Sequence, residues 1–213
     1  MRSDFERHVD LLIEDDPVLA GLVGTHGRPE PFDRSPTFDT LVLLVLEQQV
    51  SLDSARAAFD RLTQAVRVEP KEILAMSDDH LRRIGFSRQK TRYVRELARW
   101  VSDERIDLDE LTALDDAAVR TALTRVPGIG PWTADVFLMS ALGRADVWPS
   151  GDRALAVATA EALGLTGAPA PAELEEIGER WRPHRSAAAQ ILWHAYLRRR
   201  RRRIPSSRQD AVE

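Results

Sequence analysis

Apolar side chains recur every three to four residues along most of this 213-residue chain. This spacing places them on one face of a helix, whereas a strand would carry them at every second position. Ser51 and Ser87, residues of the type that start helices, stand directly before two of these segments. The run from Thr40 to Leu46 is almost entirely apolar and continues into Glu47 without a turn, so we interpret it as a buried helix. The pattern predicts an all-α fold.

The distribution of glycine, proline and arginine divides the chain into three parts. Residues 24–36 are rich in glycine and proline and are expected to form a loop, so that residues 1–36 make an N-terminal helical segment and loop that pack on the core. The core spans residues 37–197. Residues 198–213 contain seven arginines and two acidic residues, and we expect a disordered basic tail there. The rest of the chain is net acidic, which excludes a uniformly basic coat for nucleic acid but not a local basic patch.

Cysteine is absent from the sequence. Disulfide scaffolds, thiol nucleophiles and iron–sulfur clusters are therefore excluded. No apolar run approaches the roughly 20 residues that a bilayer-spanning helix needs, and the first residues do not resemble a secretory leader. We therefore expect a protein that works inside the cell, away from membranes.

The most informative stretch is residues 123–134, Leu-Thr-Arg-Val-Pro-Gly-Ile-Gly-Pro-Trp-Thr-Ala. One helix is predicted to end at Val126 and another to begin at Pro131, with Gly128 and Gly130 in the tight turn between them. The two glycines permit a positive φ and the close approach of another backbone. The free N–H groups of the turn and the positive end of the second helix would then favour an anion, such as a nucleic-acid phosphate. An ordinary corner between two helices uses the same residue types.

The same stretch matches the helix-hairpin-helix motif, and three further strings agree in order, at residues 46–51, 85–90 and 181–186. Over residues 37–197 the sequence resembles the helix-hairpin-helix (HhH-GPD) DNA glycosylase superfamily, specifically its 3-methyladenine DNA glycosylase II branch. The resemblance implies two helical lobes with the active site in the cleft between them. It also implies a compact member, because about 35 residues precede the core and longer bacterial members carry an extra domain there.

The resemblance implies an enzyme that acts on double-stranded DNA with damaged bases. Such an enzyme flips the damaged nucleotide out of the duplex before it reacts. It would hydrolyse the N-glycosidic bond of alkylated purines of the 3-methyladenine type, in base excision repair, and leave an abasic site. It would act as a monomer, require no cofactor, and work in the cytoplasm at the nucleoid, or in the nucleus if the cell is eukaryotic.

Asp152 matches the position of the family's catalytic aspartate, 22 residues after Gly130. On local grounds alone it is equally well a helix N-cap. A fixed carboxylate suits the reaction, because positive charge builds on the sugar as the bond breaks, and it can also orient or deprotonate the attacking water. Members that also cut the strand carry a lysine directly before the Thr-Ala pair, where this chain has Trp132. The match therefore predicts a monofunctional glycosylase without lyase activity.

Aromatic side chains hold an electron-poor, cationic base by stacking and cation–π attraction. The family match assigns this role to Trp132 and Trp193, and Trp148 is a candidate third wall. Val136 stands where some members have a stacking tyrosine, and Arg153 stands where some have an aromatic residue. We expect a roomier and less aromatic base pocket on that side.

Polar residues at several helix ends are candidates for contacts with DNA. Gln48 and Gln49 are predicted at the corner that fills the gap left by the flipped base, with Gln49 as the wedge; surface polarity is the alternative. The arginine face of residues 88–99 fits phosphate contacts and a solvated helix face equally well. The remaining candidates are Gly128, Gly130, Thr133, Ser87 and Lys90.

The family match also raises a cation at the hairpin and two alternative functions. In some members the backbone carbonyls that match Thr124, Val126 and Ile129 hold a monovalent ion, so Na⁺ or K⁺ is a candidate ligand. One alternative function is a glycosylase for ethenopurine or deaminated bases, which the Val136 and Arg153 differences permit. The other is a non-catalytic protein that binds damaged DNA through the hairpin, which the presence of Asp152 disfavours.

Overall fold

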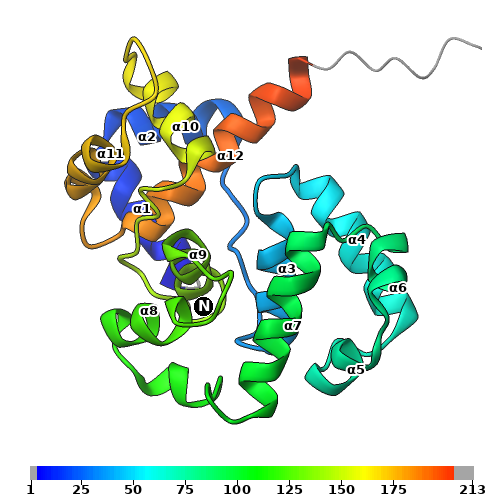
Figure 1. Cartoon of the computed structure of the whole chain (residues 1–213). Coiled ribbons are helices and arrows are strands. Elements are labelled where there is room, and N and C mark those ends of the chain that lie inside the picture. The colour runs from blue at the N-terminus through cyan, green and yellow to red at the C-terminus, as the bar shows by residue number, and fades with distance from the viewer. Residues whose placement is uncertain (1–3, 204–213) are drawn as a thin grey trace, which may run out of the picture. The chain divides into compact units, whose positions relative to one another are not determined.

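The computed structural model of the chain describes residues 4–203, and all regular secondary structure in that range is helical (Figure 1). This confirms the predicted all-α class. The helices are α1 (Asp4–Asp15), α2 (Pro17–His26), α3 (Phe38–Glu47), α4 (Leu52–Ala65), α5 (Pro70–Ala75), α6 (Asp78–Arg83), α7 (Arg88–Ser102), α8 (Asp116–Thr124), α9 (Pro131–Ser140), α10 (Arg153–Leu163), α11 (Pro171–Gly178) and α12 (Arg185–Arg203), with short 3-10 helices η1 (Glu110–Ala113) and η2 (Glu179–Trp181).

The chain divides into two compact units. Unit 1 comprises the described residues of Met1–Pro31 and Ala145–Glu213, and unit 2 comprises Phe32–Arg144. This division differs from the predicted one, in which residues 1–36 pack on a continuous core. The N-terminal helices instead share a unit with the C-terminal part of the chain, because the buried side chains of α1 and α2 pack against α12.

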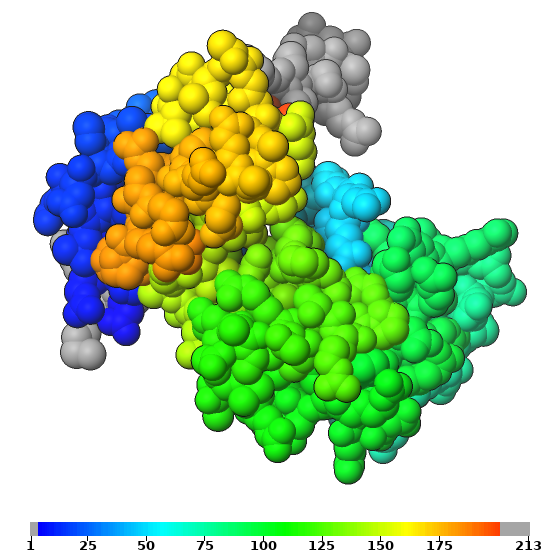
Figure 2. All heavy atoms as spheres, turned by 60° about the vertical axis from the view of Figure 1, so that its left-hand side comes forward, coloured from blue at the N-terminus to red at the C-terminus, as the bar shows by residue number. Residues whose placement is uncertain are grey.

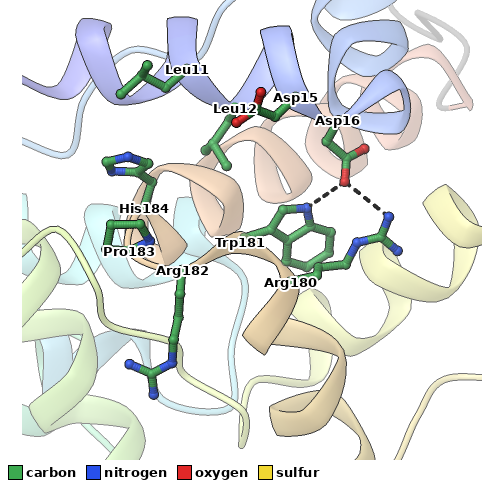
Figure 3. A pocket seen from close by; sticks show the side chains of 9 residues that line it. All are labelled: Leu11, Leu12, Asp15, Asp16, Arg180, Trp181, Arg182, Pro183 and His184. Atoms are coloured by element: carbon green, nitrogen blue, oxygen red, sulfur yellow. Dashed lines mark hydrogen bonds and ion pairs between the residues drawn. The ribbon is translucent and has the colours of Figure 1, made fainter.

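In unit 1, helix α12 lies among α1, α2 and α10 (Figure 1). Figure 2 shows the N-terminal helices, in blue, beside the orange residues of α11 and η2. A pocket of about 330 Å³ lies between α1 and the turn after η2 (Figure 3). There the buried Trp181 donates its indole N–H to Asp16 Oδ2 at 2.9 Å, and Arg180 pairs with the same carboxylate. Asp16 is itself the N-cap of α2, so this contact ties α2 to η2.

The predicted basic tail is partly helical. Helix α12 continues to Arg203, so the first residues of the segment 198–213, expected to be disordered, belong to a helix. The reason is local: arginine is a good helix former, and no proline lies between the start of α12 at Arg185 and Pro205. Residues 204–213 lie outside the described residues.

In unit 2, helix α3 is the central element. Phe38 and residues 40–46 are all buried, and α3 packs against α4, α7 and α9, which confirms that this apolar run is a buried helix. Ser51 and Ser87 cap α4 and α7 as predicted, since each hydroxyl accepts a backbone N–H three residues on at 3.2 Å. Among the described residues of both units, no helix combines the length and the apolar character needed to cross a bilayer.

Candidate functional site

The turn between α8 and α9 in unit 2 is the predicted hairpin. Helix α8 ends at Thr124 and α9 begins at Pro131, close to the predicted boundaries. Gly128 has φ +96°, a conformation that side-chain-bearing residues rarely adopt. A Cβ at this position would lie 2.6 Å from the Cβ of Tyr93 on α7 and nearer still to its ring. The Tyr93 side chain therefore lies directly against the turn, and only glycine fits there.

Gly130 differs from Gly128, and the expectation that both glycines serve a positive φ is wrong for it. Its φ is −100°, which any residue adopts, and apart from its two neighbours in the chain no described residue has an atom within 4 Å of the place a Cβ would take. The close approach within the protein therefore belongs to Gly128 alone. Gly130 is the N-cap of α9 and has open space beside it.

The backbone N–H groups of both glycines are candidates for an anion. Within the described part of the chain, neither the Gly128 amide nor the Gly130 amide donates a hydrogen bond. Each residue is partly exposed. The positive end of α9 follows directly, and it favours negative charge. The turn thus presents two unused donors and a helix dipole to the outside, which are the elements of a phosphate site.

Gln48 fixes this turn from inside unit 2. Its Nε2 donates to the Gly128 carbonyl at 2.9 Å and to the Thr133 hydroxyl at 3.0 Å. Thr133 is only 1% exposed. Both side chains therefore support the hairpin from within unit 2. Their predicted contacts with DNA stay predictions.

Gln49 has the opposite character. It is an exposed, non-glycine residue with φ +58°, in the left-handed region that costs free energy for such residues. Val50 and Leu52 beside it are 45% and 50% exposed, which is unusual for large apolar side chains. The end of α3 thus presents an exposed corner with an amide and two apolar side chains. The wedge role of Gln49 stays a prediction.

Lys90 contacts the last turn of α3, directly before this corner. Its Nζ donates to the Leu46 carbonyl in the last turn of α3 at 2.5 Å, where the negative end of the helix favours a cation. Partial burial lowers the pKa of the Lys90 ammonium, since desolvation disfavours its charged form. The hydroxyl of Ser87 is used as the N-cap of α7. Both residues have structural roles in unit 2, and their predicted phosphate contacts stay predictions.

An ion pair that the sequence analysis did not identify joins the two helices of the hairpin. Arg120 on α8 donates its Nε to Asp135 Oδ1 on α9 at 2.6 Å, and the Asp135 side chain is 13% exposed. The signal in the sequence is a charged residue inside the otherwise apolar helix of residues 131–140. A buried carboxylate needs a partner, so such a residue indicates a cation nearby.

Asp152 lies in unit 1 as the N-cap of α10. Its Oδ1 accepts the Leu155 N–H at 2.5 Å, and the same oxygen accepts the indole N–H of Trp193 on α12 at 3.0 Å. The carboxylate is therefore held at the positive end of α10 by donors from two helices. Trp193 is buried. Its indole N–H donates to the candidate catalytic group, a role that adds to the one predicted for it in the base pocket.

The segment leading to Asp152 is anchored to the start of α12. The Ser186 hydroxyl accepts the Val147 N–H at 3.0 Å, and the Ser186 N–H donates to the Ala145 carbonyl at 3.0 Å. Arg185 is buried and pairs with the Asp146 carboxylate at 2.8 Å. Helix α12 therefore positions Asp152 twice, through the backbone before it and through the Trp193 side chain.

The other predicted pocket residues fall into two groups. Trp148 is 3% exposed, donates its indole N–H to the Leu174 carbonyl at 2.8 Å, and packs on Trp181 at 5.2 Å between ring centroids. This placement favours a role in the core of unit 1 over a third pocket wall. Trp132 and Val136 lie on α9 in unit 2; Trp132 is partly exposed, whereas Val136 is buried. Their predicted base contacts stay predictions.

Comparisons with known proteins agree with these features. Residues 42–183 match the family described as HhH-GPD superfamily base excision DNA repair protein. A curated relative, DNA-3-methyladenine glycosylase 1 of Schizosaccharomyces pombe, is 28% identical over 88% of this chain and 85% of its own length. The chain spans less of other curated relatives, for example 62% of one from Bacillus subtilis and 59% of another from S. pombe.

Two solved structures are similar over nearly their whole length. The S. pombe 3-methyladenine DNA glycosylase Mag1, in complex with abasic DNA, superimposes with a TM-score of 0.78 at 28% identity, covering 90% of this chain and 95% of that one. A DNA-3-methyladenine glycosidase from Bacillus halodurans gives a TM-score of 0.70 at 31% identity, covering 92% and 93%. The all-helical architecture is thus shared with both.

Proposed function

Because the chain belongs to the HhH-GPD superfamily of base excision DNA repair proteins, we propose that it is a monofunctional DNA glycosylase. It flips alkylated purines of the 3-methyladenine type out of double-stranded DNA, hydrolyses their N-glycosidic bond and leaves an abasic site. It works as a monomer on chromosomal DNA, at the nucleoid or in the nucleus. The curated and structural relatives named as 3-methyladenine glycosylases support this substrate class.

The observation that carries the proposal is the carboxylate of Asp152. Breaking the N-glycosidic bond develops positive charge on the deoxyribose, and a carboxylate already held in place stabilises that charge without reorganising. The Leu155 and Trp193 N–H groups hold it there. The same group orients or deprotonates the water that attacks the sugar. An alkylated purine leaves readily because it already carries positive charge, so a separate general acid is not needed.

The hairpin of unit 2 binds the DNA backbone. The free amides of Gly128 and Gly130 bind a phosphate, and Gln49, with Val50 and Leu52 beside it, fills the space left by the flipped base. Phosphate contacts of this kind position a protein without reading sequence, which suits an enzyme that must search any DNA for damage.

A monovalent cation would bind at the same turn, through the backbone carbonyls of Thr124, Val126 and Ile129. Backbone carbonyl oxygens are ligands that suit alkali cations. The Val126 carbonyl also accepts the Ile129 N–H at 3.0 Å, which leaves its second lone pair for an ion. When bound, Na⁺ or K⁺ would add positive charge next to the phosphate; the residues of the turn hold it through the main chain.

The substrate class is tested with duplexes that contain one defined lesion each. Purified protein is incubated with duplexes containing 3-methyladenine, ethenoadenine, hypoxanthine or no lesion, and abasic sites are then converted to breaks with alkali. We expect breaks with the alkylated purine and none with undamaged DNA. Release of only ethenoadenine or hypoxanthine would favour the alternative lesion range. Tight binding without any release would favour a non-catalytic damage-binding protein.

The absence of lyase activity gives a second expected result. Without alkali, the DNA strand should remain intact, and borohydride should trap no covalent adduct, because an amine nucleophile is required for both. The chain has only two lysines, Lys71 and Lys90, and the Lys90 ammonium is bound to the Leu46 carbonyl. A trapped adduct would contradict the monofunctional assignment. Repeating the trapping with Lys90→Arg would then establish whether this lysine, whose pKa is lowered, is the nucleophile.

Trp193→Phe is expected to slow excision at saturating enzyme by roughly tenfold or more, since a hydrogen bond to a charged group contributes about 1.5–3 kcal/mol. The variant keeps an aromatic ring but loses the N–H that holds Asp152. Duplex affinity should stay close to that of the wild type. Trp181→Phe is the matched control, because it also removes an indole N–H from an aspartate in unit 1, Asp16. Equal excision rates in the two variants would show that the Trp193 bond does not act on catalysis.

A further inference from the structure

The arginines on the face of α7 differ in their partners within unit 2, and this difference decides which of them is available for DNA. Arg95 donates to the Leu74 carbonyl at 3.3 Å and to the Met76 carbonyl, which ends α5, and it pairs with Asp78 at 2.9 Å. Arg99 pairs with Glu96. Both arginines therefore already have carboxylate partners within unit 2. The other two arginines of this face, Arg88 and Arg92, have no such carboxylate partners among the described residues.

Arg92 lies in a cluster that adjoins the hairpin. Its guanidinium carbon is 5.2 Å from the centroid of the Tyr93 ring. The Tyr93 hydroxyl accepts the Gln89 side-chain N–H at 2.8 Å. The hydrogen bond from Gln89 and the neighbouring Arg92 guanidinium lower the pKa of the Tyr93 hydroxyl, since both stabilise the phenolate. The same tyrosine ring lies against Gly128, so one side chain joins the cluster to the turn.

We infer that Arg92, Tyr93 and Gln89 form a second phosphate-binding patch beside the hairpin. This inference rests on the proposed binding of DNA by the hairpin, and it extends that surface to α7. Successive phosphates of one strand rise by about 3.4 Å along the duplex axis, so a cation adjoining the turn meets a phosphate next to the one held by the amides. Tyr93 positions both contacts, through Gly128 on one side and Arg92 on the other.

The chemistry of the cluster fits a phosphate rather than a purely structural role. A guanidinium over a ring uses its face for the cation–π contact, and its N–H groups at the edge stay able to donate. Glu96, the carboxylate one turn further along α7, is paired with Arg99 and therefore does not neutralise Arg92. Arg92 and Gln89 are exposed, and Tyr93 is partly exposed. A positive charge and two donors thus lie together at the surface next to the turn.

The test is the salt dependence of duplex binding. Arg92→Gln should weaken binding to damaged and undamaged duplex alike and lower the slope of log Kd against log salt concentration by about 1, the value for one lost phosphate contact. Arg92→Lys, which keeps the charge, should restore most of that slope. The control is Arg82→Gln on α6 in the same unit, which should keep the wild-type slope because Arg82 is paired with Asp79 and the substitution leaves the Arg99–Glu96 pair of α7 intact. A change in packing alone would not move the slope.

The results of these binding measurements distinguish a failure of this inference from a failure of the proposed function. Wild-type protein without measurable affinity for duplex would contradict the function itself. A wild-type slope in Arg92→Gln, together with clear duplex binding by the unaltered protein, would overturn only the patch on α7. An equal loss of slope in Arg82→Gln would also overturn it, since the effect would then reflect net charge rather than a contact at Arg92.

Discussion

Asp152→Asn is expected to lower base excision by about 10²–10³-fold or more, the size of effect seen when a preorganised electrostatic contact to a transition state is removed. The amide oxygen of asparagine can still accept the Leu155 and Trp193 N–H groups, so the side chain keeps its place. Asparagine is also a good N-cap, so the stability of α10 should change by only a few tenths of a kcal/mol. Only the negative charge is lost. Single-turnover excision at saturating enzyme measures the effect, and duplex affinity should be retained.

The matched control for this variant is Asp115→Asn. Asp115 is the N-cap of α8 and accepts the Ala118 N–H at 2.8 Å, so the substitution removes the same charge from the same kind of position. It should excise at the wild-type rate. Near-wild-type turnover in Asp152→Asn would show that Asp152 is a structural cap only, and the proposed chemistry would then need another carboxylate.

Local signals explain how much of the fold could be predicted from the sequence. Helix starts at Leu52 and Arg88 depend on the serine directly before each helix, and the buried α3 depends on an unbroken apolar run. The division into units could not be predicted in this way, because it depends on α1 and α2 packing against α12, far away in the sequence. Periodicity tells which face of a helix is buried, but not against which partner.

The candidate site shows the same limit. Asp152 was identified through its position in a family pattern, whereas its bond to Trp193 joins residues 41 positions apart and has no local signal. Tyr93 was not predicted as a hairpin residue, because its contact with Gly128 is also long-range. Trp148 shows the limit from the other side: a tryptophan near Asp152 in the sequence fits a pocket wall and a core position equally well, and only its long-range bond to the Leu174 carbonyl favours the core.

The two hairpin glycines have different sensitivities, which the sequence alone does not reveal. Gly128→Ala places a methyl group against the Tyr93 ring at φ +96°, so we expect it to distort the turn and lower the stability of unit 2. Loss of DNA binding in that variant would not identify the DNA-contacting surface. Gly130 has φ −100° and open space around its would-be Cβ, so a side chain there leaves the fold intact.

Gly130→Asp is therefore the informative variant for the hairpin, and we expect it to lower affinity for damaged and undamaged duplex together by at least about tenfold. A carboxylate beside the free Gly128 and Gly130 amides competes for those donors and repels the phosphate, two effects of the same sign. Gly167→Asp is the control. It adds the same charge at an exposed loop position of unit 1, again with nothing within 4 Å of the new Cβ. Fluorescence anisotropy with a labelled duplex measures the affinity of both variants, and circular dichroism establishes that each variant is folded.

Duplex affinity in Gly130→Asp equal to that in Gly167→Asp would exclude the turn from the DNA interface. A smaller loss of duplex affinity in Gly130→Asp that disappears at high salt would instead mean that the new carboxylate repels DNA from a distance. Direct competition of that carboxylate for the amides would persist after its charge is screened.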